Sequence, residues 1–451
     1  MRLTRALPEV PDSILASFDL RLDRTSAAPV AVAYSGGGDS LFLLLAARLW
    51  AETCERPLLA LHVDHRLQPQ SSAWAEQARA VAAELGADFR LLPWTGEKPV
   101  TGLPAAARTA RLTLMAEAAR EAGAGAILLG HTANDVRESD LMRAEGSTLG
   151  GLSEWAPSPV WPQGRDLFHF RPLLNLSRDE IRKRLREKEW NWIEDPANED
   201  LRYGRSRARA ALSSALPGDP RLDPERDDIG QRLSLGSGLR RDLWGKFSNG
   251  VDAAVVMTFG REALHGSDDP PLKAALVCAS GVARLPRSDR LTNLRDRLRC
   301  GDRFTATLAG ARIEAGKDVL ICRDAGEYAR SGSPRLELAP GRAGVWDGRF
   351  EVACQDEGWC VMPLKGRAAR LPKAQRDALR CIPAAARPTL PVLVNGAETV
   401  TCPLLAEVPG VRVRPLVATR LAGALGLIRT EAEAVSAAHG AGAVCALSWG
   451  G

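Results

Sequence analysis

Short apolar runs alternate with longer amphipathic segments through the first 145 residues. Most of these runs end at a glycine or a polar residue, which is typical of strands buried in a parallel sheet. Strands separated by helices of this length form right-handed βαβ units, so we expect a Rossmann-like α/β domain whose ligands bind at the carboxyl ends of the strands. The sequence predicts strands at 29–34, 57–63, 88–92 and 126–129 and helices at 39–50, 72–85 and 104–123, with a further helix from about 134.

The length of the chain predicts more than one domain. Its 451 residues exceed what a single hydrophobic core usually holds. A stretch rich in Pro, Gly and Asp at 215–240 reads as a linker, and short runs separated by Gly and Pro after 331 suggest strands. We therefore predict a catalytic α/β domain at 1–214, a linker with a helical or mixed region at 215–330, and a small β-rich domain at 331–451.

The composition is that of an ordinary globular protein, with 45% apolar and 25% charged residues. No apolar run is long enough for a membrane-spanning helix, and the first residues lack the apolar core of a signal peptide. We therefore expect a cytoplasmic protein with no membrane partner. The net charge of +5 is too small to identify a nucleic-acid partner, but basic residues gather between 171 and 209, where a phosphate-binding surface or a solvated helix face would both fit.

The nine cysteines contain no C-x-x-C pair. Zinc ribbons and iron–sulfur sites usually need such close pairs, so both are disfavoured. Eight of the nine follow residue 270, and we expect them to be reduced and buried as small apolar residues of a C-terminal core.

A glycine-rich turn, Ser35-Gly36-Gly37-Gly38-Asp39-Ser40, joins the first predicted strand to the first predicted helix. Glycines let backbone N–H groups approach an anion, and the helix N-terminus adds its positive dipole. We expect Asp39 or Ser40 to cap the helix. Asp39 would repel a bare phosphate, so it fits the turn either as a ligand of Mg²⁺ or as a cap of the turn's own N–H groups. No lysine follows, so this is not the lysine-containing phosphate loop, and a purely structural turn is the alternative.

This turn resembles the SGGxDS loop of the PP-loop superfamily (N-type ATP pyrophosphatases), whose domain is adenine nucleotide alpha hydrolase-like and which cleaves ATP between its α and β phosphates. Later motifs are similar, in the same order, to those of the tRNA(Ile)-lysidine synthetase family. They stand at 62–65, 107–111, 130–138, Gly146-Ser147 with Gly151-Leu152, 171–174, and 194–200 followed by Arg205 and Arg209. The resemblance covers residues 30–210, and the motifs at 171–174 and after 194 are its most discriminating part.

The resemblance implies an ATP-dependent ligase that uses Mg²⁺. ATP would adenylate the 2-oxygen of the wobble cytidine in the isoleucine tRNA with a CAU anticodon. The ε-amine of L-lysine would then attack carbon 2 and displace AMP, which gives lysidine, AMP and pyrophosphate. The C-terminal parts would grip the tRNA. The oligomeric state stays open, a homodimer being one option.

The same resemblance implies the candidate site residues. Nucleotide binding falls to the six loop residues and to two residues that follow strands, Asp64 and His131, and the catalytic set is Asp39, Arg111, Asp135, Glu138 and Arg205, with Asp39 and Asp135 holding the metal. Arg108 and Arg111 share one helix face, as do Asp135 and Glu138, so each pair could equally be an ordinary surface pair. A lone histidine after a strand is as often structural as functional.

The chain departs from the family pattern in the fourth-strand motif. Asn134 replaces the first of two adjacent acids, Val136 a glutamine and Arg137 a small residue, whereas Asp135 and Glu138 are retained. Leu112, Thr148 and Glu154 are further departures. Two alternatives therefore stay open: another PP-loop tRNA modifier of the thiolating type, and a tRNA-binding homologue without activity.

Overall fold

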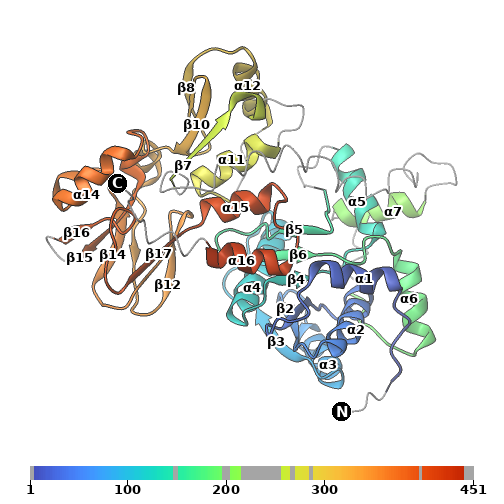
Figure 1. Ribbon diagram of the computed structural model, residues 1–451. Coiled ribbons are helices and arrows are strands. Elements are labelled where there is room, and N and C mark those ends of the chain that lie inside the picture. Colours follow the sequence, from blue (N-terminus) through green and yellow to red (C-terminus); the bar gives the residue numbers. More distant parts are fainter. Residues whose placement is uncertain are drawn as a thin grey trace. The chain divides into compact units, whose positions relative to one another are not determined.

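The computed structural model describes residues 5–145, 151–195, 204–214, 255–264, 270–283, 288–395 and 399–440. The chain divides into two compact units (Figure 1). The first contains Met1–Leu235 and Arg429–Ala434, and the second contains Gly236–Ile428 and Val435–Gly451. The three-domain division stays a prediction, and the predicted linker at 215–240 lies outside the described residues. Within them, no helix combines the length and apolar character needed to cross a membrane.

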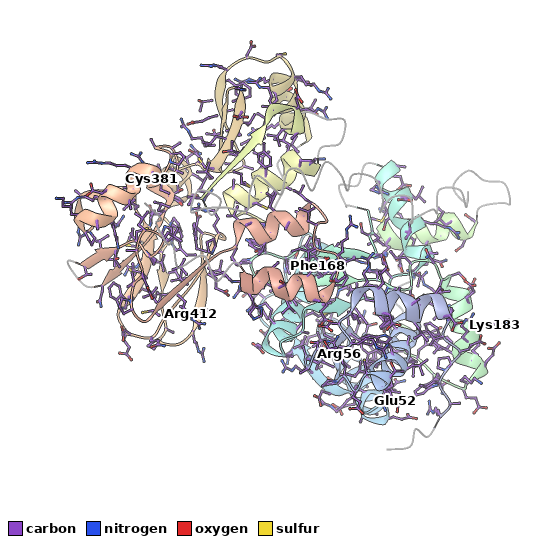
Figure 2. All side chains as sticks on the ribbon, viewed as in Figure 1. Glu52, Arg56, Phe168, Lys183, Cys381 and Arg412 are labelled. Atoms are coloured by element: carbon purple, nitrogen blue, oxygen red, sulfur yellow. The ribbon has the colours of Figure 1, made fainter. Side chains whose placement is uncertain are left out.

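A six-stranded sheet forms the centre of the first unit, in the order β3-β2-β1-β4-β6-β5. All neighbouring pairs are parallel except β5 with β6. The four predicted strands are confirmed, and β5 and β6 extend the sheet, with Phe168 of β6 (labelled in Figure 2) stacked on Trp155 of β5. The strands are β1 (Val30–Ala33), β2 (Leu58–Asp64), β3 (Asp88–Pro93), β4 (Ala126–Leu128), β5 (Trp155–Pro157) and β6 (Phe168–Phe170).

Helices cover both faces of this sheet. Ala31, Leu61 and Ile127 point to the face that α4 covers with Leu112 and Met115. The alternate strand residues point to the opposite face, as the pleat requires. The buried helix α2, which packs on β1 and β2, covers that opposite face. The helices are α1 (Asp12–Arg21), α2 (Gly38–Thr53), α3 (Ser71–Glu84), α4 (Leu103–Glu121), α5 (Ala133–Ala144), α6 (Arg178–Glu187) and α7 (Gly204–Ser213).

The strand order places a switch point between β1 and β4. From β1 the chain proceeds outward through β2 and β3 and then crosses back to β4 on the other side of β1. The turns that follow β1 and β4 therefore meet at one edge, where ligands bind in sheets of this class. The turn after β1 leads into α2 at Gly38, and its N-cap is Gly37 without a side-chain cap. The predicted cap by Asp39 or Ser40 is therefore wrong, and among the described contacts the one side chain that accepts from the start of this helix is Ser35, which accepts the Gly37 N–H at 3.4 Å.

Antiparallel sheets dominate the second unit. Two of them lie after 331, where the sequence predicted strands, and a third lies at 256–323, where it predicted a helical or mixed region. Their orders are β7-β10-β9-β8, β11-β14-β15-β16 and β12-β13-β17. Helices α11 (Pro270–Ser280), α12 (Ser288–Arg299) and α15 (Val417–Ala424) pack on the first of these sheets. The strands are β7 (Val256–Gly260), β8 (Phe304–Leu308), β9 (Ala311–Ala315), β10 (Asp318–Arg323), β11 (Leu336–Glu337), β12 (Ala343–Trp346), β13 (Phe350–Cys354), β14 (Trp359–Pro363), β15 (Pro391–Asn395), β16 (Thr399–Thr401) and β17 (Val411–Pro415).

The remaining elements of the second unit are short helices and the last helix. They are η4 (Arg261–Leu264), α13 (Glu327–Ser331), η5 (Ala368–Arg370), α14 (Lys373–Ala378), η6 (Leu379–Cys381), η7 (Arg387–Thr389) and α16 (Glu431–Gly440), whose first turn belongs to the first unit. Most described cysteines after 270 are buried as free thiols, but Cys300 and Cys381 are exposed, so the prediction of a buried set is wrong for these two.

Candidate active site

The glycine-rich turn closes on itself through its two serines. The Ser40 hydroxyl donates to the Gly37 carbonyl at 2.9 Å and accepts the Ser35 backbone N–H at 3.2 Å. The Ser35 and Ser40 hydroxyl oxygens are 3.1 Å apart. Gly36 has a φ of +86°, a conformation that residues with a side chain rarely adopt. These contacts, all within the turn, fix its shape.

Residues Trp192 and Ile193 lie across this turn. The Ile193 N–H donates to the Gly36 carbonyl at 2.9 Å. A Cβ on Gly36 would stand 2.4 Å from the Ile193 side chain, and one on Gly38 would stand 3.4 Å from the Trp192 ring. Trp192 is itself flanked by Arg182 and the guanidinium of Arg186. The glycines therefore leave room for this covering segment, a role that the sequence pattern did not reveal.

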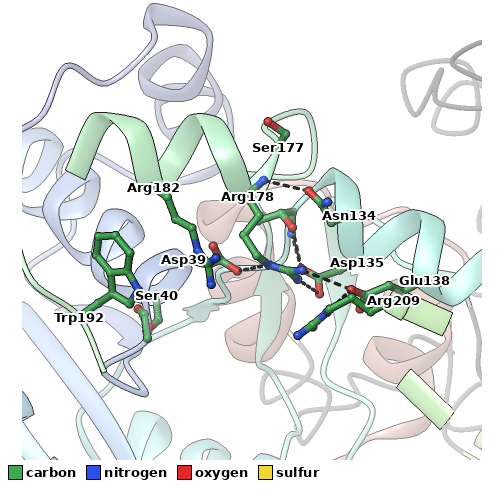
Figure 3. Close-up of polar contacts among 12 residues, drawn as sticks. Asp39, Ser40, Asn134, Asp135, Glu138, Ser177, Arg178, Arg182, Trp192 and Arg209 are labelled. Carbon is green, nitrogen blue, oxygen red and sulfur yellow. Dashed lines mark hydrogen bonds and ion pairs between the residues drawn. The ribbon is translucent and has the colours of Figure 1, made fainter. Parts of the chain in front are cut away.

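One arginine joins the three predicted catalytic acids (Figure 3). The guanidinium of Arg178, at the start of α6, donates to Asp39 at 3.1 Å, to Asp135 at 3.1 Å and to Glu138 at 3.3 Å. Burial raises the pKa of Asp39, and the cation of Arg178 opposes that rise. The three carboxylates thus surround a single cationic group.

Two arginines of α7 complete this acid cluster. Arg205 donates to Asp135 at 2.7 Å and to Glu138 at 2.9 Å, and Arg209 donates to Glu138 at 2.9 Å. The Glu138 side chain is 1% exposed, so a charge there requires partners of this kind. Asp135 also accepts the Thr132 N–H at 2.7 Å and so holds the start of α5. We call Asp39, Asp135 and Glu138 with Arg178, Arg205 and Arg209 the acid–arginine cluster.

A second group of arginines carries positive charge that no described acid offsets by direct contact. Arg111 is half-buried, its buried Nε has no hydrogen-bond partner among the described residues, and desolvation lowers its pKa to about 10. Its neighbours Arg108 and Arg205 lower that pKa further. Burial also lowers the pKa of Arg171 to about 10. Such desolvated cations favour an anionic ligand, and a polyphosphate supplies charges of the required sign.

His131 and Asp64 occupy different surroundings. His131 Nδ1 accepts a hydrogen bond from Arg171 Nε at 3.1 Å, and burial together with Arg171 and Arg205 holds its pKa well below the usual range. Asp64 is buried at the end of β2, where it accepts the Arg66 N–H at 2.8 Å. Among the described contacts, none joins Asp64 to the acid–arginine cluster.

The structure thus joins Asp39, Asp135 and Glu138 through the Arg178 guanidinium and places Arg205 on Asp135 and Glu138. Arg111 lies near Asp135 and Arg205. Two further members of the cluster, Arg178 and Arg209, are absent from the predicted site. Arg209 belongs to the motif that begins at residue 194. Arg178 follows Ser177, the N-cap of α6, and its sequence context gave no sign of its partners, because they come from distant parts of the chain.

The departures from the family pattern have local explanations. Asn134 Oδ1 accepts the backbone N–H of Arg178 at 2.9 Å and so fixes the start of α6. Val136 and Leu112 are buried in the core, and Glu154 accepts a hydrogen bond from Arg21 at 2.7 Å. Thr148, the Gly146-Ser147 motif and the motif residues 196–200 lie outside the described residues.

The carboxylate oxygens of Asp39 and Asp135 are ligands of the kind that Mg²⁺ prefers. This ion prefers oxygen ligands and usually takes one or two carboxylates together with substrate phosphates. The carboxylates of Asp39 and Asp135 both contact the Arg178 guanidinium, so the two side chains reach one cation at once. A metal ion at that point would use these two groups.

Comparison with known proteins identifies the relatives of this chain. The family model of the PP-loop domain matches residues 13–216. The chain is 51% identical over 428 residues to the tRNA(Ile)-lysidine synthase of Caulobacter vibrioides, which covers 93% of this chain and 98% of that protein. It is 34% identical over 331 residues to the tRNA(Ile)-lysidine synthase of Brucella melitensis biotype 2, across 71% of this chain and 73% of that protein.

Among solved structures, the chain is similar to the U34-tRNA thiolase NcsA from Methanococcus maripaludis. The two are 18% identical, with a TM-score of 0.38, over 45% of this chain and 71% of that chain.

Proposed function

The chain belongs to the tRNA(Ile)-lysidine synthase family, and we propose that it ligates L-lysine to carbon 2 of the wobble cytidine of the tRNA(Ile) with a CAU anticodon. The reaction consumes ATP and releases AMP and pyrophosphate. The observation that carries the proposal is the acid–arginine cluster beside a glycine-rich turn at the switch point of a parallel sheet. Such a site can hold a triphosphate and cationic groups at the same time.

The first step joins the cytidine to AMP. The cytidine 2-oxygen attacks the α phosphorus, the bond to the β-phosphate oxygen breaks, and pyrophosphate leaves. The N–H groups at the start of α2 and the cation of Arg111 neutralise the phosphates, because phosphoryl transfer depends mainly on positioning and charge. Asp39 and Asp135 would hold Mg²⁺, which lowers the charge on the triphosphate when bound.

The second step joins lysine to the activated base. The ε-amine attacks carbon 2, and the carbon–oxygen bond to AMP breaks. Asp135 and Glu138 attract the ε-ammonium group, and one of these carboxylates accepts the proton that this group must lose before attack. The guanidinium groups that now contact these acids would give way to the cationic groups of the substrates.

We further propose that the second unit grips the tRNA and that the enzyme acts in the cytoplasm. The oligomeric state stays open, a homodimer included. The thiolating alternative would require a sulfur donor and usually paired cysteines, and the chain has no C-x-x-C pair.

Lysine incorporation tests the function. Purified protein, ATP and labelled lysine are incubated with the isoleucine tRNA that has a CAU anticodon and, in parallel, with the methionine tRNA of the same anticodon. We expect label in the isoleucine tRNA only, together with equimolar AMP. Binding of tRNA without label or AMP would favour the inactive homologue, and sulfur transfer would favour the thiolating enzyme.

A further inference from the structure

Arg171 lies between two imidazole rings beside the acid–arginine cluster. Its Nε donates to His131 Nδ1 at 3.1 Å, and its Nη2 is 3.4 Å from His169 Nδ1. Its Nη1 donates to the Ser153 carbonyl at 2.8 Å. Arg171 and His169 are buried. The neighbouring strands β4 and β6 bring these groups together, since Arg171 follows β6 and His131 follows β4.

These contacts determine which nitrogen of His131 carries the proton. An arginine has five N–H donors and no acceptor. A ring nitrogen that faces it at hydrogen-bond distance must therefore offer a lone pair. His131 Nδ1 is unprotonated for this reason, so in the neutral ring Nε2 carries the hydrogen. His169 is held in the same tautomer.

The free nitrogen of His131 is available to a ligand. The ring is half-buried, and its Nε2 has no hydrogen-bond partner among the described residues. Four arginines, Arg108, Arg111, Arg171 and Arg205, act electrostatically on the ring and disfavour a second proton on it. His131 therefore offers a neutral N–H donor among cations that attract an anion.

We propose that Arg171 is a positioning residue, which holds His131 as an Nε2–H donor to the α-phosphate of ATP during adenylyl transfer. The inference rests on the proposed function for the identity of the anion, whereas the tautomer rests on the contacts of Arg171 alone. A donor with a fixed tautomer stabilises charge that develops on the non-bridging oxygens, without the cost of reorienting at the moment of reaction. The role of His131 as a nucleotide ligand thereby becomes a specific contact through one nitrogen.

Nitrogen NMR tests the tautomer. Two-bond ¹H–¹⁵N spectra of the full-length ¹⁵N-labelled protein distinguish protonated from unprotonated ring nitrogens, and the His131→Gln spectrum assigns the His131 signals by their loss. We expect an unprotonated Nδ1 and a protonated Nε2 in the wild type and in Arg171→Lys, since lysine also only donates. In Arg171→Gln the amide oxygen can accept from Nδ1, so a protonated Nδ1 should appear.

Kinetics test the role. A glutamine amide nitrogen reaches the position of histidine Nε2, whereas an asparagine amide nitrogen reaches that of Nδ1. In ATP- and lysine-saturated assays we expect His131→Gln to stay within about 10-fold of the wild-type kcat and His131→Asn to lose about 10²-fold, the scale of one lost donor. Arg171→Gln should lower kcat at least about 10-fold and, when lysine is varied at saturating ATP, should leave the KM for lysine unchanged, whereas Arg171→Lys should retain most activity.

Arg56→Gln serves as the matched control, because Arg56 is also buried but contacts neither histidine. It should lower thermal stability without changing the His131 signals. A protonated Nδ1 in the wild-type protein, or equal losses in His131→Gln and His131→Asn, would overturn the proposal. If the enzyme formed no lysidine, the nitrogen spectra would still decide the tautomer, so failure of the proposed function remains distinguishable from failure of this inference.

Discussion

At the scale of single residues, this site depends on charges that stay buried because they contact one another. Glu138 is almost fully buried and accepts hydrogen bonds from three arginines. Removing one partner of such a group leaves an uncompensated charge, which costs more than the pair itself contributes. A substitution of any acid or arginine of the cluster therefore also affects the residues that contact it.

Asp39 is the acid to change first, because it belongs to the glycine-rich turn. We expect Asp39→Ala to lower the rate of ATP-dependent AMP formation at least about 10²-fold, as for the loss of one preorganised electrostatic group. Pyrophosphate release at saturating lysine and tRNA measures the effect. Glu52→Ala, at the exposed end of the same helix, is the control and should match the wild type. Turnover of Asp39→Ala near the wild-type rate would contradict the assignment of Asp39 to the metal.

His169 makes stability depend on pH. Burial and the nearby cation of Arg171 hold its pKa well below the usual 6.5. The unfolded chain binds a proton below about pH 6.5 while the folded protein does not, so this contribution is complete above pH 6.5 and is lost as the pH falls, by about 1.4 kcal/mol per pH unit. Urea unfolding between pH 7.5 and 5 should show a shallower decline in His169→Gln than in the wild type. Equal slopes in the two proteins would contradict the assignment.

At the scale of elements, the segment at 190–195 explains why the glycine-rich turn at 35–40 needs its glycines. Ile193 and Trp192 pack against Gly36 and Gly38 and add a backbone hydrogen bond. The turn is therefore held from one side by protein while its other groups remain available for phosphate. The motif after residue 194 follows directly, so the same segment connects the turn to α7, which carries Arg205.

Gly36→Ala should cost more stability than the backbone conformation alone explains. A positive φ costs a residue with a side chain about 1–2 kcal/mol, and Gly36→Ala adds the clash with Ile193. Gly86→Ala is the matched control, since Gly86 has a φ of +65° and open space around its Cα. A double-mutant cycle with Ile193→Ala, followed by urea unfolding, isolates the clash. If Gly36→Ala and Gly86→Ala lowered the free energy of unfolding equally, residues 192–193 would accommodate the added methyl group without cost.

At the scale of the whole molecule, a segment from near the end of the chain belongs to the first unit. Residues 429–434 join that unit, where the Glu431 carboxylate accepts hydrogen bonds from the Arg56 guanidinium at 2.6 and 3.0 Å and from the Asp23 N–H at 2.9 Å. Both members of this ion pair are buried. The first unit therefore includes residues far apart in the sequence, which this ion pair joins.

Glu431→Ala should destabilise the first unit by about 3–5 kcal/mol, because it leaves the Arg56 cation buried without its carboxylate. Thermal and urea unfolding of the full-length protein measure the loss. Glu433→Ala, on the exposed side of the same helix, removes only a capping contact and should cost about 1 kcal/mol. If the two variants were equally stable, the pair would not hold this segment in place.

Periodicity and motif order were sufficient to predict the parallel sheet, its first four strands and the glycine-rich turn between the first strand and the helix that follows it. These features are local: alternating apolar residues bury a strand, and glycines permit a tight turn, whatever lies elsewhere in the chain. The predicted acids Asp135 and Glu138 share a helix face because they stand three residues apart. The order of the strands brings them near Asp39, and all three acids contact Arg178.

Only the tertiary structure decided which cations meet those acids. The strand order 3-2-1-4 brings the turns after β1 and β4 together, and packing of α6 and α7 then places Arg178, Arg205 and Arg209 among the acids. Spacing along the chain carries no signal for such contacts, because their partners lie far apart in the sequence. The tautomer of His131 and the pairing of Arg56 with Glu431 depend in the same way on partners that folding alone brings within hydrogen-bond distance.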